Sequence, residues 1–282
     1  MKKMFIPTLL AGLMASSCVL AALPQAIKDK GEISAAIVPN YPPMDFKDPA
    51  TNKLTGFDFD LGNALAERLG VKIKWQETGF EQMLSGLTTK RVDIVLSGMT
   101  DTAERQKAVT FVDYFTSGPQ LYTLAKREEI KELTDLCGKK VGTSRRTTWP
   151  SEITAWSKAN CEAAGKPAIV VIGTEGSADA RAQLQQNRLD AAMQGSETIP
   201  YLMSLDKGKY KAVGLAISKQ FTGLGIEKSN TELVAAISEA LQGMIDDGTY
   251  AKILKKWDLE QGAVEKISIN ASQLPHWFCV HI

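Results

Sequence analysis

The chain has 282 residues, of which 44% are hydrophobic and 23% are charged, a composition typical of globular proteins with about two domains. Its 33 lysines and arginines are balanced by 32 aspartates and glutamates, and no long run of like charge stands out. Because a nucleic-acid-binding protein usually carries a basic stripe, this charge distribution excludes nucleic acid as a partner.

The first residues have the arrangement of a secretory signal peptide. A short basic region, Met1-Lys2-Lys3, precedes an apolar stretch over residues 4–20, and small side chains precede a cleavage point after Ala21. Because the apolar stretch is marginal for spanning a bilayer, we expect cleavage and a periplasmic protein rather than a membrane anchor. Cys18 leaves a lipid-modified cysteine as a third possibility, although residues 15–17 match a lipoprotein signal poorly. No later segment is apolar enough to span a membrane.

The cysteines predict one disulfide. Because an exported chain meets an oxidising compartment, we expect Cys137 and Cys161, which lie in one region, to be joined. Closing a loop of that length contributes about 3 kcal/mol in the chain-entropy picture. Cys279, near the terminus, can pair between molecules or stay free. No close pairing of cysteine and histidine supports a metal site, so we expect no metal and no other cofactor.

From Glu32 onward, short apolar strands alternate with helical patterns. Leu61, Leu65 and Leu69 lie on one face of a helical pattern, and residues 101–104 resemble a capping box that opens another helix. In chain order, the first part predicts strands over residues 33–38, 71–75 and 92–96 and helices over 60–69, over 80–87 and from 101.

The same order recurs in the second part. The last long helix starts near Asn230, carries an apolar stripe from Leu233 to Ile245 and stops at Gly248. The predicted elements are strands over residues 140–142, 169–172 and 189–193 and helices over 151–164, 178–186, 230–247 and 250–257. Strands that alternate with helices predict an α/β architecture with mostly parallel sheets and helices on both faces.

Three separated stretches carry a family resemblance. They are residues 56–61 (GFDFDL), residues 93–105 (DIVLSGMTDTAER) followed by 111–115 (FVDYF), and residues 247–257 (DGTYAKILKKW). In order and spacing they resemble the motifs of bacterial extracellular solute-binding proteins of the polar amino-acid ABC-transporter type (family 3). Phe59 departs from this pattern, because it replaces a more usual aliphatic side chain. The resemblance covers residues 26–269, which is most of the mature chain.

The resemblance implies a two-lobed periplasmic-binding-protein fold with a ligand cleft between the lobes, which close about a hinge. The implied division is a signal peptide over 1–21, a discontinuous first lobe over 32–121 and 223–269, a second lobe over 127–212, hinge crossings over 122–126 and 213–222, and a tail over 270–282.

In the first lobe the resemblance implies that Arg105 binds the ligand. A guanidinium fork can hold a carboxylate with two parallel hydrogen bonds, and free N–H groups at a helix start also favour an anion. Spacing alone would favour an exposed surface arginine, and only the surrounding motif reverses this. The other implied ligand-binding residues are Ser97, Gly98 and Thr100 in the preceding turn, and Tyr41 and Phe80, whose rings match positions that sandwich the ligand.

In the second lobe, residues 145–148 lie where the family has a Gly-Thr loop before a helix. Thr147 and Thr148 match this loop and are implied to contact the ligand, whereas Arg146 replaces the glycine. Two adjacent arginines are more often solvated surface, so a role for Arg146 in binding a ligand charge is an open alternative. Trp149 is unusual at its position and is a candidate to narrow the pocket.

The main departure from the family lies at Gly195, where many relatives carry an aspartate that pairs with the ligand's ammonium group. Its absence leaves three possibilities open. Glu197 can substitute from nearby, Gln194 can hydrogen-bond a modified amino group, or the ligand lacks a free ammonium. In the last case Arg145 and Arg146 favour a solute with extra negative charge.

The resemblance therefore predicts a monomeric binding protein without catalytic activity, which captures an amino acid or an amino-acid-like carboxylate and delivers it to the membrane permease of an ABC importer. The alternative is an exported cyclohexadienyl or arogenate dehydratase on the same fold. An enzyme of that kind needs a general acid or base, and Glu197 and Asp45 are the only acids that the sequence nominates. A detached sensor domain is a third class, but such domains are usually fused to a spanning helix.

Overall fold

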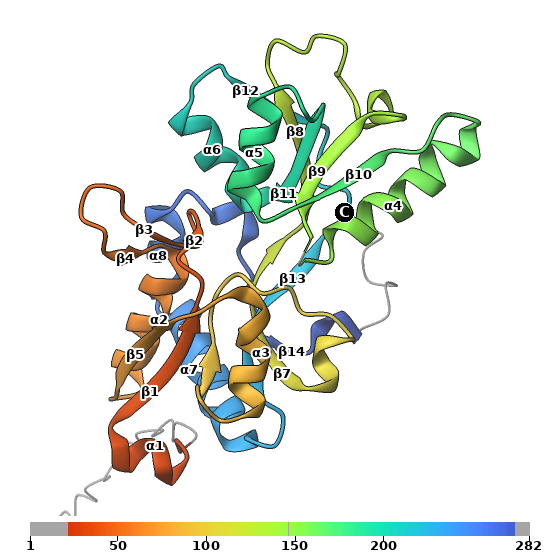
Figure 1. Cartoon of the computed structure of the whole chain (residues 1–282). Coiled ribbons are helices and arrows are strands. Elements are labelled where there is room, and N and C mark those ends of the chain that lie inside the picture. Colours follow the sequence, from red (N-terminus) through yellow and green to blue (C-terminus); the bar gives the residue numbers. More distant parts are fainter. Residues whose placement is uncertain (1–21, 146, 274–282) are drawn as a thin grey trace, which may run out of the picture.

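The computed structural model describes residues 22–145 and 147–273, which form two α/β lobes that lie one above the other in Figure 1. The predicted signal peptide with Cys18, the side chain of Arg146, and the end of the tail with Cys279 lie outside the described residues. No helix within the described part of the chain is long and apolar enough to cross a membrane.

The first lobe is built on a six-stranded sheet with the order β14-β7-β13-β6-β1-β5. Its strands are β1 (Glu32–Ile37), β5 (Lys72–Glu77), β6 (Ile94–Val95), β7 (Val109–Ser117), β13 (Gln220–Glu227) and β14 (Ser268–Ile269). β1 is parallel to β5 and β6, whereas β13 is antiparallel to both of its neighbours. The sheet thus combines strands from the beginning and from the end of the chain.

Helices cover both faces of this sheet. They are α1 (Gln25–Lys30), α2 (Phe57–Arg68), α3 (Phe80–Thr88), α7 (Thr231–Asp246) and α8 (Thr249–Lys256). Leu61 and Leu65 are four residues apart and therefore lie on the same face of α2. Both pack in a buried core that also contains Leu233 of α7. Met83 of α3 packs with Phe111 in a second core. The predicted helices and strands in this lobe are present within a few residues, with one exception.

The exception is the helix predicted to start at residue 101. That prediction is wrong, because the chain forms only a 3-10 turn, η1 (Arg105–Lys107), before β7 begins at Val109. The carboxylate of Asp101 accepts hydrogen bonds from the side chain of Gln106 and from the backbone N–H of Ser272. Asp101 is thereby engaged in tertiary contacts, and too few residues remain before β7 for a full α-helix.

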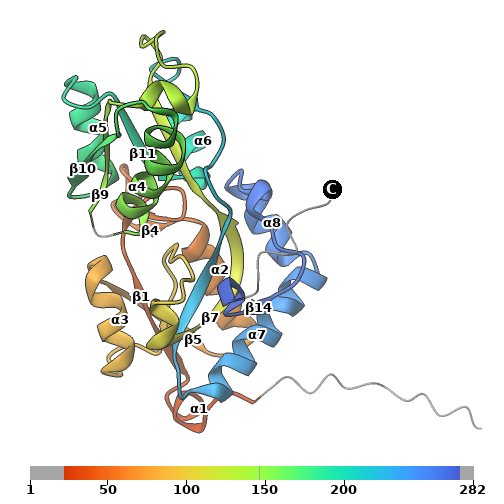
Figure 2. The same cartoon turned by 90° about the vertical axis from the view of Figure 1, so that its right-hand side faces the viewer.

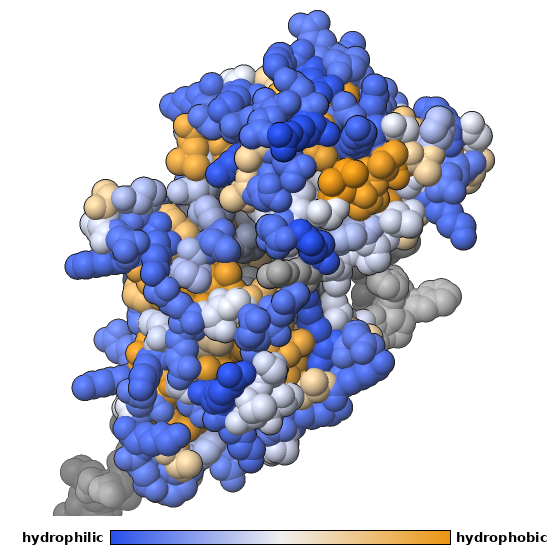
Figure 3. Space-filling view, viewed as in Figure 1, coloured by the Kyte–Doolittle hydropathy of each residue, from blue (hydrophilic) through white to orange (hydrophobic). Residues whose placement is uncertain are grey.

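The second lobe is built on a five-stranded sheet with the order β10-β9-β11-β8-β12. Its strands are β8 (Pro119–Leu124), β9 (Lys140–Ser144), β10 (Val170–Thr174), β11 (Ala191–Gly195) and β12 (Tyr210–Val213), and its helices are α4 (Trp149–Asn160), α5 (Ser177–Gln185) and α6 (Ile199–Leu205). The predicted disulfide is present between Cys137 and Cys161, and it ties the segment before β9 to the end of α4. An apolar patch lies over the edge strand β10 in Figure 3, where Val170 is 46% exposed.

A small three-stranded sheet joins the first lobe to the boundary between the lobes. It consists of β2 (Asn40–Tyr41), β3 (Asp45–Lys47) and β4 (Leu54–Thr55). The remaining short elements are the 3-10 turns η2 (Leu133–Leu136), η3 (Glu162–Ala164), η4 (Ser196–Thr198), η5 (Glu260–Gly262) and η6 (Ala271–Gln273).

The chain passes between the two sheets at Gly118 and again over residues 214–219. The two passages touch, because a β-carbon at Gly118 would lie 1.8 Å from the backbone oxygen of Ser218. Figure 2 shows β7 and β13 rising side by side from the first lobe toward this boundary. The segment 122–126, expected as the first crossing, falls in β8 and the turn after it.

Candidate functional site

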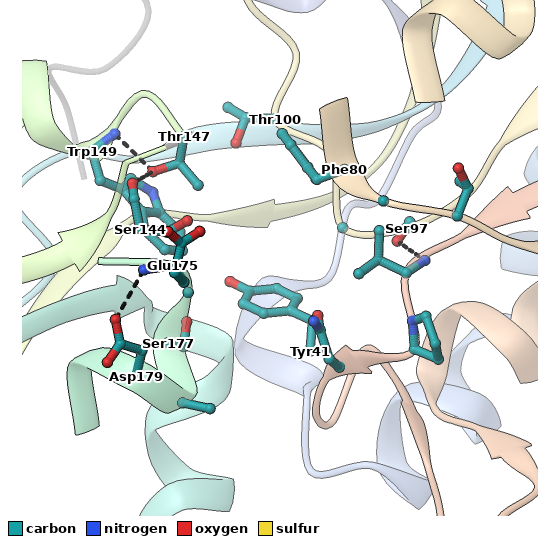
Figure 4. A pocket seen from close by; sticks show the side chains of 18 of the residues that line it. Tyr41, Phe80, Ser97, Thr100, Ser144, Thr147, Trp149, Glu175, Ser177 and Asp179 are labelled. Carbon is teal, nitrogen blue, oxygen red and sulfur yellow. Dashed lines mark hydrogen bonds between the residues drawn. The ribbon is translucent and has the colours of Figure 1, made fainter. Parts of the chain in front are cut away.

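A cavity of about 450 Å³ opens between the two lobes. It lies at the carboxyl ends of parallel strands in both sheets, which is where open α/β sheets usually bind ligands. Figure 4 shows the polar side chains of the second lobe facing Tyr41, Phe80 and Ser97 of the first. The described lining is formed by residues 38–41, 78–80, 97, 98, 100 and 105 of the first lobe and residues 144, 147–149 and 175–179 of the second.

Arg105 is the only arginine or lysine among the described residues that line the cavity. It lies on η1, where its guanidinium donates a hydrogen bond of 2.7 Å to the backbone oxygen of Thr100 and lies 5.2 Å from the centre of the Phe80 ring. Burial lowers the pKa of Arg105, and the nearby charge of Asp101 acts in the opposite direction. A guanidinium at the wall of a cavity can bind a carboxylate through two parallel hydrogen bonds.

Ser97 and Gly98 line the cavity as expected, but their polar groups point into the protein. The Ser97 hydroxyl donates a hydrogen bond of 2.6 Å to Asp45. It also accepts a hydrogen bond from the N–H of Val38, which Figure 4 shows as a dashed line. The N–H of Gly98 donates a hydrogen bond of 2.6 Å to Asp58. Both residues are therefore bonded to buried carboxyl groups, and Thr100 and Arg105 are the polar members of this loop that are left to face a ligand.

The two carboxyl groups behind this loop, Asp45 and Asp58, are fully buried. Burial raises the pKa of Asp58 to about 7, against hydrogen bonds from Tyr114 and Gly98 that lower it. Burial and then the charge of Asp58 hold the pKa of Asp45 well above its ordinary value. One oxygen of Asp45 has no hydrogen-bond partner among the described residues. Burial thus favours the protonated form of both carboxyl groups.

Tyr41 also lines the cavity, and its hydroxyl contacts the second lobe. It donates a hydrogen bond of 2.7 Å to Glu197, whose other carboxylate oxygen accepts one from the Ser117 hydroxyl. Burial, and then the charge of Glu197, raise the pKa of Tyr41 well above its ordinary value, and burial also raises the pKa of Glu197. The Glu197 carboxylate is thus held by two hydroxyl groups of the protein itself.

This contact explains the glycine at position 195. A β-carbon there would lie 2.2 Å from a carboxylate oxygen of Glu197 and 2.3 Å from the Tyr41 hydroxyl. Gln194, Gly195 and Glu197, all expected at the ligand, are absent from the described lining of the cavity; Gly195 and Glu197 pack against the Tyr41 hydroxyl, and Gln194 is buried in β11. Sequence spacing could not reveal this, because Tyr41 approaches from the other lobe.

The second lobe supplies Thr147, Thr148 and Trp149 to the lining, as expected. The Thr147 hydroxyl donates to the backbone oxygen of Ser144, and the Thr148 hydroxyl donates to Glu152. The Trp149 ring lies 6.5 Å from that of Tyr41, and both rings line the cavity. Arg146, the remaining residue of this predicted loop, is outside the described residues.

The turn between β10 and α5, which was not predicted as part of the site, contributes Glu175, Ser177 and Asp179 to the lining. Asp179 accepts a hydrogen bond of 3.0 Å from the N–H of Glu175, and this bond lowers the pKa of Asp179. Arg145 is an exposed partner of Glu175 and does not line the cavity. The missed signal was the position of this turn after a predicted strand, at the carboxyl edge of the sheet.

Within residues 22–145 and 147–273, no group of three or more His, Cys, Asp or Glu side chains is arranged to hold a metal ion. The site therefore offers a guanidinium, aromatic rings, hydroxyl groups and two carboxylates, an arrangement suited to a small organic solute.

Comparisons with known proteins agree with this geometry. The model of the bacterial extracellular solute-binding proteins, family 3, matches residues 33–260. The L-cystine-binding protein TcyA of Bacillus subtilis is 33% identical over 236 residues, which cover 82% of this chain and 83% of that protein. The arginine-binding protein ArgT of Corynebacterium glutamicum is 28% identical over 256 residues, covering 91% of this chain and 84% of that protein.

Solved structures are similar over the same region. An ancestral arginine-binding protein bound to arginine matches with a TM-score of 0.71 and 33% identity, covering 80% of this chain and 98% of that one. The ancestral amino-acid-binding protein AncCDT-1, a precursor of cyclohexadienyl dehydratase, matches with a TM-score of 0.73 and 30% identity, covering 83% of this chain and 98% of that one.

Proposed function

Because the chain belongs to family 3 of the bacterial extracellular solute-binding proteins, we propose that it captures an amino acid or an amino-acid-like carboxylate between its lobes and delivers it to the membrane permease of an ABC importer. The observation that carries this proposal is the guanidinium of Arg105, which is placed over the interlobe cavity by η1 and Phe80. A small solute with one carboxylate is the simplest partner for a single guanidinium in such a cavity.

The cavity also supports a specific pose. The ligand carboxylate lies at Arg105 and Thr100, and the carbon chain lies between the rings of Phe80, Tyr41 and Trp149. The polar or positive end of the ligand then faces the hydroxyl groups and carboxylates of the β10–α5 turn, among them Asp179. A solute with a second negative charge has less support in this pose, because Arg145 does not line the cavity and already pairs with Glu175.

Binding is proposed to close the lobes about the two crossings at Gly118 and residues 214–219, with a first lobe over 32–117 and 220–269 and a second lobe over 119–213. The protein then acts as a monomer in the periplasm, after removal of residues 1–21 as a signal peptide. The relatives named periplasmic binding proteins support this location.

Isothermal titration calorimetry of the purified protein with L-arginine, L-cystine, L-histidine and L-glutamine tests the proposal. We expect one of these amino acids to bind with a stoichiometry of one. Arg105→Lys keeps the charge but loses the fork, and should weaken binding by about 10- to 100-fold, the effect of a lost charge-assisted hydrogen bond. The matched control is Arg91→Lys, an exposed arginine that bonds to Thr89. Equal affinity of both variants would contradict the proposal.

The enzymatic alternative has one observation in its favour, the similarity to a precursor of cyclohexadienyl dehydratase. Against it, the two acids nominated from the sequence do not line the described cavity: Asp45 faces Ser97, and Glu197 faces Tyr41 and Ser117. We therefore propose a binding protein rather than an enzyme. Turnover of prephenate or arogenate by the purified protein, followed by absorbance of the aromatic product, would reverse this choice.

A further inference from the structure

The C-terminal segment 268–273 contacts the back of the loop that carries Arg105. This segment lies beyond residue 260, where the match to the family model ends. It consists of β14, which pairs with β7, and the short turn η6. In Figure 2 the last described residues, drawn in dark blue at β14, lie beside β7 and β13.

Two side chains of the loop bond directly to Ser272. The amide of Gln106 donates one hydrogen bond of 2.6 Å to the Ser272 hydroxyl and another of 2.6 Å to Asp101. The N–H of Ser272 donates to the second oxygen of Asp101 at 3.2 Å. Asp101 is 3% exposed and Gln106 is 2% exposed, so water is largely excluded from these bonds. The three residues form a closed ring of hydrogen bonds.

The segment is anchored independently of this ring. Asn270 exchanges two hydrogen bonds with the backbone of Phe111, one through its side chain and one through its N–H. The N–H of Ala271 donates a hydrogen bond of 2.9 Å to the buried carboxyl of Asp113. Phe111 and Asp113 lie in the middle of β7, within the sheet of the first lobe. Ser272 is therefore held against a rigid strand.

The first residues of the loop are tied to β13, because the N–H of Asp101 donates a hydrogen bond to the backbone oxygen of Phe221. Around Arg105 the backbone bonds are local, from Gln106 to Thr102 and from Ala108 to Arg105, and η1 is only three residues long. Asp101 directly follows Thr100, and Gln106 directly follows Arg105. A contact that fixes Asp101 and Gln106 thus fixes the two neighbouring residues that face the cavity.

We propose that segment 268–273 positions the ligand-binding loop, with Ser272 and Gln106 as positioning residues that hold Arg105 at the angle a ligand carboxylate needs. The inference rests on the proposed function in one respect, namely that Arg105 contacts the ligand. A guanidinium binds a carboxylate through two hydrogen bonds only when the two groups are aligned to within a fraction of an ångström. Residues that position Arg105 therefore affect affinity even though they do not contact the ligand.

Hydrogen exchange of the ligand-free protein, followed by mass spectrometry, tests the support itself. Gln106→Met removes both donated bonds at similar side-chain volume, and Ser272→Ala removes the hydroxyl acceptor. Both variants should exchange faster in a peptide spanning residues 99–108, and a lobe-two peptide over 140–160 should be unchanged. Ser272→Thr keeps the hydroxyl and should restore wild-type exchange. The control is Ser229→Ala, whose hydroxyl bonds only to nearby Glu227 in the described structure. Unchanged exchange in Gln106→Met would overturn the proposal.

Calorimetry with the amino acid that the wild type binds, from the four named above, tests the link to Arg105. Gln106→Met should raise Kd by about tenfold, but by less than about twofold in an Arg105→Lys background, because the two residues act as one unit. Equal effects in both backgrounds would overturn the positioning role. If the wild type binds none of the four, the proposed function fails, while the exchange experiment still decides whether the segment supports the loop.

Discussion

The hydroxyl of Tyr41 donates a hydrogen bond of 2.7 Å to the carboxylate of Glu197, and this bond joins the two lobes on one side of the cavity. A second contact crosses the same boundary, where the rings of Phe46 and Tyr201 lie 5.6 Å apart. A hydrogen bond to a charged group in a buried place contributes about 1.5–3 kcal/mol. The protein thus supplies part of the free energy that holds its lobes together.

The first prediction concerns this bond. Tyr41→Phe keeps the ring at the cavity but leaves Glu197 with one donor, so the closed arrangement should lose about 1.5–3 kcal/mol. Ligand affinity should fall correspondingly in calorimetry, and the radius of gyration of the ligand-bound protein in X-ray scattering should rise. Tyr201→Phe, which removes a hydroxyl at the same boundary, is the control and should change neither. Wild-type affinity in Tyr41→Phe would show that the bond is not needed for closure.

A second prediction concerns the space beside this bond. Gly195→Ala places a methyl group on the Glu197 carboxylate and the Tyr41 hydroxyl, so one of them must move. The free energy of unfolding, measured in urea, should fall by about 1–3 kcal/mol, as for other overpacked sites. At Gly176 a β-carbon meets nothing within 4 Å, so Gly176→Ala is the matched control. Equal stability of the two variants would contradict the crowding.

The third prediction concerns pH. The pKa of Asp58 is raised to about 7, and that of Asp45 lies well above its ordinary value, so the folded state holds protons that the unfolded chain releases near pH 4. Since the folded state binds more protons at these two groups in this window, their contribution to stability falls as the pH rises from about 4 toward 7. Asp45→Asn removes one such group and should flatten the fall by up to about 1.4 kcal/mol per pH unit.

Urea unfolding at pH 5, 6 and 7 measures this slope. Asp48→Asn is the control, because Asp48 is exposed and hydrogen bonds from Thr51 lower its pKa, so its titration lies below this window. A slope in Asp45→Asn equal to that of the wild type would mean that Asp45 is ionised in the folded protein at pH 5.

The fourth prediction concerns the disulfide. The bond between Cys137 and Cys161 closes a loop with a sequence separation of 24 that includes β9 and α4. Replacing both cysteines by serine should lower the free energy of unfolding by about 3 kcal/mol, chiefly by freeing the unfolded chain. Ligand affinity should change little, since the bond lies away from the lining of the cavity. The free energy of unfolding of the wild type reduced with dithiothreitol should equal that of the variant. A reduced wild type as stable as the oxidised protein would contradict this prediction.

The sequence predicted the elements whose patterns are local. Leu61 and Leu65 fixed the inner face of α2, and Leu233 to Ile245 fixed that of α7. The helix expected from residue 101 failed for a physical reason: Asp101 bonds to Ser272, far along the chain, and this partner has no trace in the local pattern.

The same distinction applies to the site. Arg105, Thr100, Phe80 and Thr147 follow strands or begin helices, and topology alone brings them to the cavity. The Ser97 hydroxyl points into the protein because it bonds to Asp45, which lies on another element. Glu197 likewise bonds to Tyr41 of the other lobe and does not line the cavity. Side-chain direction set by such distant partners cannot be deduced from spacing.

The interleaved order of the first sheet governs how the molecule must assemble. Its central strand β13 begins at Gln220, after every strand of the second sheet has been made. As the chain emerges from its amino end, residues 119–213 can therefore complete their sheet while β6 and β7 still present bare edges. Such edges readily pair with strands of other proteins, so the nascent chain must be protected from aggregation until β13 has been synthesised.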